Sequence, residues 1–161
     1  MFLAFNSEMA SVFAFAVDKM AILNPESPMS TALSMSSAGL ASLADRMIEG
    51  DVVGVYVPPG EPNEVYALPL DSYGAITKSV DIGDSEGLAA LLNACPNEYH
   101  GRRDALNEAA EVGRSDLIDI ILRCGHEGEE DIALDRAKNA GHLEAAEIIE
   151  LHIRGLWDGV L

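Results

Sequence analysis

Residues 104–124 (DALNEAAEVGRSDLIDIILRC) and 132–152 (IALDRAKNAGHLEAAEIIELH) align with each other without a gap. The two stretches are identical at Ala105/Ala133, Leu106/Leu134, Ala109/Ala137, Gly113/Gly141, Ile120/Ile148 and Ile121/Ile149. A weaker copy precedes them at residues 74–94 (GAITKSVDIGDSEGLAALLNA). A short unit that recurs in this way is typical of helix pairs that stack into a solenoid, which presents a surface and seldom encloses a pocket.

Each copy has a glycine at the same position, where a left-handed residue would end one helix and let the next begin. These glycines are Gly83, Gly113 and Gly141. In the middle copy the pattern predicts a first helix over 104–112 and a second helix that Ser115 caps and that runs to Arg123. In the first copy we expect Asp84 or Ser85 to cap the second helix. The third copy repeats the arrangement of the middle one.

The repeated unit resembles the ankyrin repeat. The middle copy matches the pattern of that family at Leu106, Ala109, Ala110, Gly113, Asp116, Leu117, Ile118, Ile120, Ile121, Leu122 and Gly125. The third copy matches it at Leu134, Ala137, Asn139, Gly141, His142, Leu143, Glu144, Ile148 and Ile149. The resemblance covers about residues 74–153 and implies a degenerate helix-pair solenoid of three repeats that binds another protein. It also implies a structural role for His142 at the turn between helices.

Two departures from the ankyrin pattern bear on where recognition would occur. The Thr-Pro pair that begins the unit in that family is absent, since Asp104-Ala105 and Ile132-Ala133 stand in its place. The turn glycines are separated by 30 and then 28 residues, fewer than the ~33 of the family. The missing residues fall in the connections that carry a projecting turn in ankyrin repeats. We therefore expect the helix faces to take more of the recognition.

The N-terminal part has a different pattern. Residues 7–23 predict a helix that Ser7 caps and that ends before Asn24-Pro25, and a second helix is expected from Ser30 or Thr31 to Glu49. The segments 52–57 (VVGVYV) and 64–70 (EVYALPL) predict a β-hairpin around the turn PPGEPN, with Pro69 closing the second strand. The expected fold is mainly α. It has an N-terminal part over 1–72, made of two helices and a hairpin, and a repeat domain over 73–161 that Trp157 seals.

The charge of the chain is its most unusual bulk property. The 161 residues include 27 acidic and 10 basic ones, which gives a formal net charge of −17. The electrostatic field of such a charge repels nucleic acid and anionic membranes and attracts basic partners. An acidic surface that serves only solubility explains the net charge equally well. The apolar first 23 residues have no basic residue before Lys19 and contain Glu8, so we expect neither a signal peptide nor a membrane anchor. The expected location is cytoplasmic.

The residues that usually carry chemistry form no recognisable set. Cys95 and Cys124 lie near the ends of successive second helices and are expected to be reduced thiols. Cys124 and His126 offer two metal ligands, but no second pair lies at ligand spacing. No nucleophile elbow, zinc-protease, phosphate-loop or dinucleotide motif is present. We therefore expect no catalytic residues, no metal and no cofactor.

Acidic side chains are the remaining candidates for a binding site, and they are densest in the connection before the third copy. The expected partner-binding residues are Glu108, Glu111, Glu127, Glu129, Glu130, Asp131 and Asp135. Arg102 and Arg103 are expected to pair with nearby carboxylates, Glu98 and Asp104. The predicted function is a non-catalytic module that binds a basic protein, as a monomer or homodimer. The alternative is a small acidic inhibitor, such as a counter-defence or toxin-immunity protein, that blocks a nucleic-acid-binding protein by charge mimicry.

Overall fold

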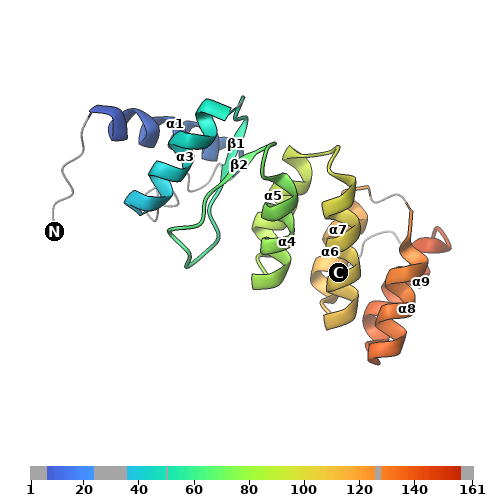
Figure 1. The fold of residues 1–161 in the computed structure, drawn as a ribbon. Coiled ribbons are helices and arrows are strands. Elements are labelled where there is room, and N and C mark those ends of the chain that lie inside the picture. The colour runs from blue at the N-terminus through green and yellow to red at the C-terminus, as the bar shows by residue number, and fades with distance from the viewer. Residues whose placement is uncertain (1–6, 24–35, 50, 126–127, 157–161) are drawn as a thin grey trace. The chain divides into compact units, whose positions relative to one another are not determined.

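The computed structural model describes residues 7–23, 36–49, 51–125 and 128–156, and within them the chain is mainly helical with one two-stranded sheet (Figure 1). The chain divides into two compact units, Met1–Ala75 and Ile76–Leu161. None of the helices in the described ranges is long and apolar enough to span a bilayer. The expected seal at Trp157 lies outside the described residues.

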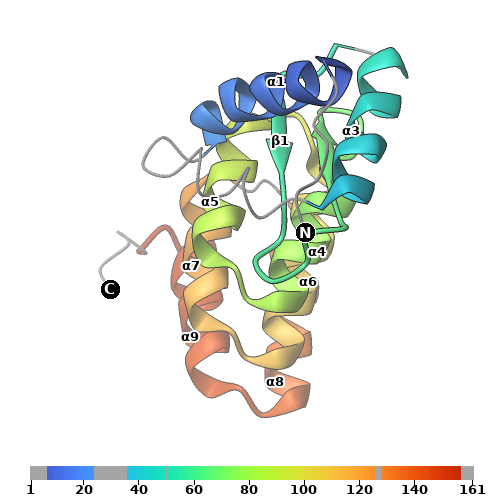
Figure 2. The same cartoon turned by 90° about the vertical axis from the view of Figure 1, so that its left-hand side faces the viewer.

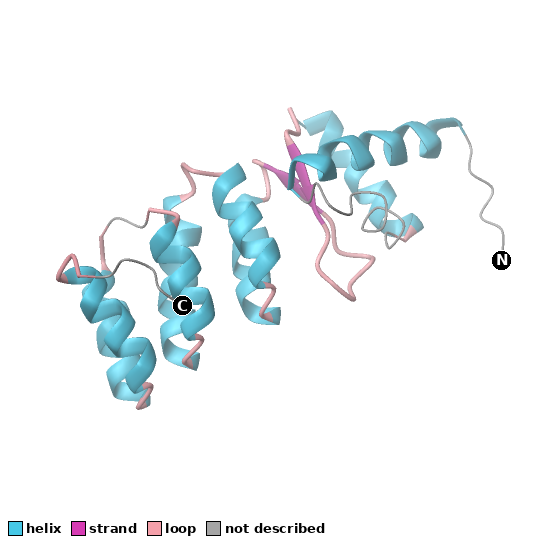
Figure 3. Ribbon diagram, turned by 180° about the vertical axis from the view of Figure 1, so that it is seen from behind, coloured by secondary structure: helices cyan, strands magenta, loops and turns pink. Residues whose placement is uncertain are grey.

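The first unit packs two helices against a β-hairpin. Its elements are α1 (Ser7–Leu23), α3 (Ser37–Glu49), β1 (Gly54–Tyr56) and β2 (Tyr66–Leu68). The strands, magenta in Figure 3, are antiparallel with Val55 opposite Ala67. Helix α1 contacts β1 and α3, and α3 contacts β2. A lone hairpin is marginally stable, so the buried side chains between it and the helices hold it in place. These include Ala16, Leu43, Val55 and Ala67.

Helix α3 begins later than the sequence pattern suggested. The helix was expected from Ser30 or Thr31, and residues 30–35 lie outside the described residues. Ser36 is described and is not helical, and its hydroxyl accepts a hydrogen bond from the backbone N–H of Gly39 at 3.0 Å. This is the bond that an N-cap side chain makes to the third helical residue. The cap therefore starts the helix at Ser37. The hairpin is confirmed, with shorter strands than expected and with Pro69 directly after β2.

The second unit consists of three helix pairs, of which the first begins with residues 72–75 at the end of the first unit. The pairs are α4 (Ser72–Ile82) with α5 (Ser85–Ala94), α6 (Tyr99–Val112) with α7 (Ser115–Arg123), and α8 (Glu130–Ala140) with α9 (Leu143–Ile153). The second helices contact one another in the order α5, α7, α9, and α6 contacts α8 in the row of first helices. Figure 2 shows these two rows side by side. Buried alanines such as Ala105 and Ala109 on α6 allow the helices to approach closely.

The three turn glycines are in the left-handed conformation, as the repeat pattern predicts. Their φ angles are +72° at Gly83, +74° at Gly113 and +79° at Gly141. Two of them are also covered by the following pair: a Cβ on Gly113 would lie 2.5 Å from Nδ1 of His142, and one on Gly83 would meet the guanidinium of Arg114. His142, which follows Gly141, therefore packs on the turn at Gly113, and Arg114, which follows Gly113, packs on the turn at Gly83.

The N-caps of the second helices differ from what the repeat alignment suggests. Asp84 caps α5 as expected, because its Oδ1 accepts the N–H of Gly87 at 2.9 Å. Ser115 does not cap α7. Arg114 occupies the N-cap position and makes no side-chain cap hydrogen bond, and Ser115 is the first helical residue. Arg114 instead binds Asp116, with Nη2 at 2.7 Å from Oδ2.

Helix α6 starts five residues before the predicted position at Asp104, and this extra turn buries Arg102. Glu98 caps the helix by accepting the N–H of Gly101 at 3.2 Å. The side chain of Arg102, only 4% exposed, was expected to pair with a carboxylate, and that expectation was wrong. Its Nη1 donates to the carbonyl oxygens of Cys124 (2.7 Å) and Gly125 (3.3 Å).

The other terminal nitrogen of Arg102 reaches the preceding pair. Its Nη2 donates to the carbonyl oxygens of Leu92 (2.5 Å) and Cys95 (3.5 Å). Cys95 and Cys124 are the C-cap residues of α5 and α7. The last carbonyls of a helix lack intrahelical donors and carry partial negative charge, which a buried cation satisfies. One guanidinium thus ties the ends of two helices together.

Replacement of Arg102 should destabilise the fold far more than replacement of its neighbour. Arg102→Met leaves buried carbonyl oxygens without donors, and we expect the free energy of unfolding to fall by about 3 kcal/mol. Arg103→Met removes a half-exposed cation and should cost less than about 1 kcal/mol. Urea denaturation followed by circular dichroism measures both. Equal losses for the two variants would contradict the role given to Arg102.

The turn glycines provide a second comparison. A Cβ at Gly141 would have no atom within 4 Å. Gly141→Ala should therefore lower the free energy of unfolding only by the strain of a left-handed alanine, about 1–2 kcal/mol. Gly113→Ala adds displacement of the His142 ring to the same strain and should therefore cost more. Urea denaturation of both variants measures the difference, and a Gly113→Ala variant at least as stable as Gly141→Ala would refute the packing of His142 on that turn.

Candidate functional site: an acidic groove on α6

One face of α6 carries a stripe of polar acceptors. Asp104, Asn107, Glu108 and Glu111 follow the i, i+3, i+4, i+7 spacing that places side chains on the same side of a helix. Together with Val112 and with Arg136 of α8, they line a groove of about 570 Å³. We call this the α6 groove. Its volume falls within the ~300–1,000 Å³ range of small-molecule sites, which leaves room for a long side chain of a partner.

Glu108 is a carboxylate in unfavourable surroundings. It is half-buried, its carboxyl is hydrogen-bonded to that of Asp81 on α4, and Glu111 lies close by. Burial raises the pKa of Glu108 first, and the nearby charges and hydrogen bond of Asp81 and the charge of Glu111 raise it further. Among the described residues, no lysine or arginine forms an ion pair with Glu108. A cation placed beside Glu108 would therefore stabilise its charged form.

Glu111 already has a cationic partner within the groove. Nη1 of Arg136 lies 2.6 Å from Oε2 of Glu111, and both side chains are exposed, at 47% and 61%. Exposed ion pairs of this kind contribute about 0.2–1 kcal/mol, because water solvates both ions well when they separate. The contact is therefore easily broken.

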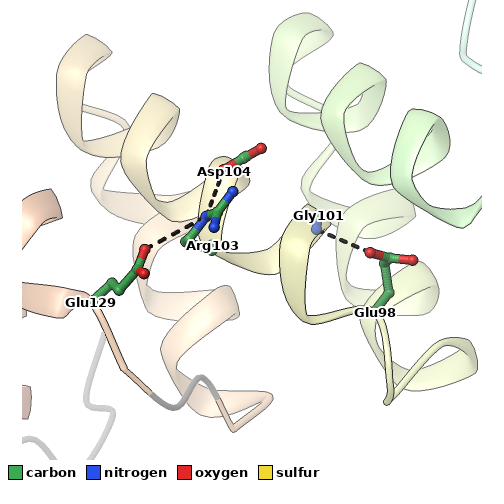
Figure 4. A network of polar contacts seen from close by, with 5 residues as sticks. All are labelled: Glu98, Gly101, Arg103, Asp104 and Glu129. Carbon is green, nitrogen blue, oxygen red and sulfur yellow. Dashed lines mark hydrogen bonds and ion pairs between the residues drawn. The ribbon is translucent and has the colours of Figure 1, made fainter.

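A further polar network links the N-terminal end of the α6 groove to the connection before α8. Nε of Arg103 lies 2.9 Å from Oδ1 of Asp104 and 3.6 Å from Oε2 of Glu129 (Figure 4). The same view shows Glu98 at the N-terminus of α6, where it caps Gly101. Arg103 thus forms the expected pair with Asp104 and also neutralises part of the acidic connection.

The structure separates the seven expected partner-binding residues into two groups. Glu108 and Glu111 line the α6 groove, whereas Asp135 is exposed on α8 and is not part of its lining. In the connection, Glu129 has φ +65° and pairs with Arg103, and Glu130 accepts the N–H of Gly128 at 3.3 Å. Asp131 is exposed, and Glu127 lies outside the described residues. The acidic connection is thus partly used in local contacts, which leaves the groove as the stronger candidate.

The sequence analysis did not assign Asp104, Asn107, Val112 or Arg136 to a binding site, and it missed Asp81 as the neighbour of Glu108. The spacing of 104, 107, 108 and 111 was a readable signal for one shared helix face. The repeat alignment also places Arg136 at the position of Glu108 and Asp81 at that of Glu111. Both signals give positions along a helix. Neither reveals that Arg136 reaches across to Glu111 or that Asp81 meets Glu108.

The cysteines and histidines form no reactive centre in the described part of the chain. Cys95 and Cys124 are free thiols, and burial raises the pKa of both, which opposes formation of a nucleophilic thiolate. Within the described ranges, no group of three or more histidine, cysteine or acidic side chains is arranged to hold a metal ion. His126, the other potential ligand beside Cys124, lies outside them.

Comparison with known protein families, with curated proteins and with solved structures finds no match to this chain. The interpretation of the α6 groove therefore depends on its own geometry and charge.

The surroundings of Glu108 predict a pH-dependent effect on stability. A carboxyl whose pKa is raised in the folded state favours folding below its unfolded pKa, and this contribution is lost as pH rises through the folded pKa. Glu108→Gln keeps the neutral form at every pH. The variant should match the wild type in acid and exceed it at neutral pH by less than about 1 kcal/mol. Urea denaturation of both proteins from acid to neutral pH tests the direction of this difference. A Glu108→Gln variant less stable than the wild type at neutral pH would contradict it.

Proposed function

We propose that the helix pairs form a degenerate ankyrin-like solenoid and that the protein is a non-catalytic module that binds a basic partner protein at the α6 groove. The observation that carries this proposal is Glu108, a half-buried carboxylate beside Asp81 and Glu111 that has no basic ion-pair partner among the described residues. A cation from a partner would relieve the repulsion among these three groups. Few exposed positions offer a comparable gain, because a fully hydrated carboxylate gains little from pairing.

The net charge supports the same partner class. A protein of formal charge −17 attracts basic surfaces over distances of about a Debye length, ~8 Å at physiological ionic strength, and repels other polyanions. Attraction of this kind raises association rates, whereas close contacts decide where the partner docks. The overall charge therefore selects the kind of partner, and the groove supplies a location.

The helix faces also suit this role better than the connections do. Helix α8 begins only a few residues after α7 ends, and Glu129 and Glu130 at its start are held by Arg103 and by a backbone N–H. The stripe from Asp104 to Glu111 instead lies along one rigid helix. A partner segment would meet acceptors whose positions the helix fixes before binding.

Neutralisation of the groove tests the proposal against a control of equal charge. Glu108→Gln with Glu111→Gln removes two charges from the groove, and Glu144→Gln with Glu147→Gln removes two from exposed positions on α9. With a fluorescein-labelled peptide of six arginines, anisotropy titrations at about 0.15 M salt should show roughly tenfold weaker binding for the groove variant. The α9 variant should lose less than about twofold.

Two results would reject the groove as the binding site. One is equal loss for the two double variants, which would show that only net charge matters. The other is binding that does not weaken as salt rises, since a charge-based contact is screened by ions.

A further inference from the structure

The α6 groove already contains one guanidinium, supplied by the protein itself. Arg136 extends from α8 to Glu111 on α6, with 2.6 Å between Nη1 and Oε2. In the repeat alignment Arg136 takes the position of Glu108, so a cation from the third pair lies opposite the acidic stripe of the second. The carboxylate of Glu111 is thus occupied by the kind of group that a basic partner would offer.

A second, separate observation also points to a hydrogen-bond donor as the missing ligand. Asn107 lines the same groove, and its Oδ1 is buried and accepts no hydrogen bond from any described residue. Buried acceptors are nearly always satisfied, so an orphan atom at a groove calls for a partner that donates. Asn107 and Glu108 are adjacent on the stripe. A cationic donor would give the Asn107 oxygen a hydrogen bond and the Glu108 carboxylate a positive charge.

The chemistry of the groove favours arginine as that donor. A guanidinium has five N–H groups in a flat fork, enough to reach a carboxylate and an amide oxygen together, whereas an ammonium is a compact point charge. The exposed side chain of Val112 at the end of the groove provides an apolar surface for the aliphatic stem.

We propose that Arg136 is a built-in competitor: it occupies Glu111 in the free protein and is displaced when an arginine side chain of the partner enters the α6 groove at Glu108, Asn107 and Glu111. This inference rests on the proposed function. It adds the identity of the recognised side chain and a contact that lowers the affinity of the free protein. Because the Arg136–Glu111 pair is exposed and weak, a partner displaces it at small cost.

Removal of the competitor should strengthen binding, and the chain offers a matched control for the accompanying change in charge. Lys138 lies two residues away on α8 and forms an exposed pair with Glu150 at 3.9 Å. Arg136→Gln and Lys138→Gln therefore remove the same charge and one exposed ion pair each. We expect Arg136→Gln to bind the six-arginine peptide about threefold more tightly than Lys138→Gln in anisotropy titrations.

A double-mutant cycle separates competition for Glu111 from a general charge effect. In a Glu111→Gln background Arg136 loses the carboxylate with which it pairs, so the advantage of Arg136→Gln over Lys138→Gln should vanish. An advantage that persists in that background, or equal affinities of the two variants in the wild-type background, would overturn the inference. A six-lysine peptide tests the recognised group: it should bind more weakly than six arginines, and this preference should shrink in Glu111→Gln. An unchanged preference would overturn the assignment of arginine.

The cycle also separates this inference from the proposed function. If Glu111→Gln weakens peptide binding while Arg136→Gln behaves as Lys138→Gln does, the groove binds basic segments and the competition is refuted. If Glu111→Gln leaves binding unchanged, the groove is not the site, and both the function and the inference fall.

Discussion

The second unit depends on one buried cation. Arg102 donates from its two terminal nitrogens to carbonyl oxygens at the C-terminal ends of α5 and α7. Since Arg102 belongs to α6, these bonds fix α6 against both second helices at once, and the stripe on its other face is held at a set position. A lysine could not make the same contacts, because an ammonium lacks the flat fork that reaches two helix ends together. The rigid display of the α6 groove is thus a consequence of a hydrogen-bond arrangement on the opposite side of the same helix.

The turn glycines restrict the opposite ends of the pairs in a different way. Gly113 and Gly83 adopt left-handed conformations, and the side chains of His142 and Arg114 lie against them. Contacts of this kind join the turns at Gly83 and Gly113 to the following pair, whereas Arg102 joins α5 and α7 at their C-terminal ends. The first and second pairs are therefore held to each other at both ends, and the face of α6 opposite Arg102 stays open as the α6 groove. This division explains how a unit with short connections can still present an ordered surface.

The sequence was informative wherever a local rule decides the structure. The helix pairs, their turns at Gly113 and Gly141 and the hairpin all follow from periodicity and the conformational freedom of glycine. It was uninformative where a side chain chooses among distant partners. Arg102 and Arg103 are adjacent and chemically identical, yet one is buried against backbone carbonyls and the other pairs with Asp104 and Glu129. The early start of α6 at Tyr99 causes this difference, and the cap at Glu98 that sets it breaks the repeat pattern. The competing pair of Arg136 and Glu111 is likewise a contact between helices, which no spacing along the chain reveals.

Basic residues are too few in this chain to pair with most of its carboxylates. At least eight of the ten basic residues form ion pairs with carboxylates, and Arg102 is bound to backbone carbonyls. With 27 acidic residues in the chain, most carboxylates must rely on water for their solvation. Water serves this purpose well at exposed positions and poorly at Glu108, which is half-buried between Asp81 and Glu111. The excess of negative charge is spread over the whole chain, and at Glu108 it has a local energetic cost. The arginine site that we propose depends on this uneven solvation, and we expect it to persist in a variant whose total charge is reduced elsewhere.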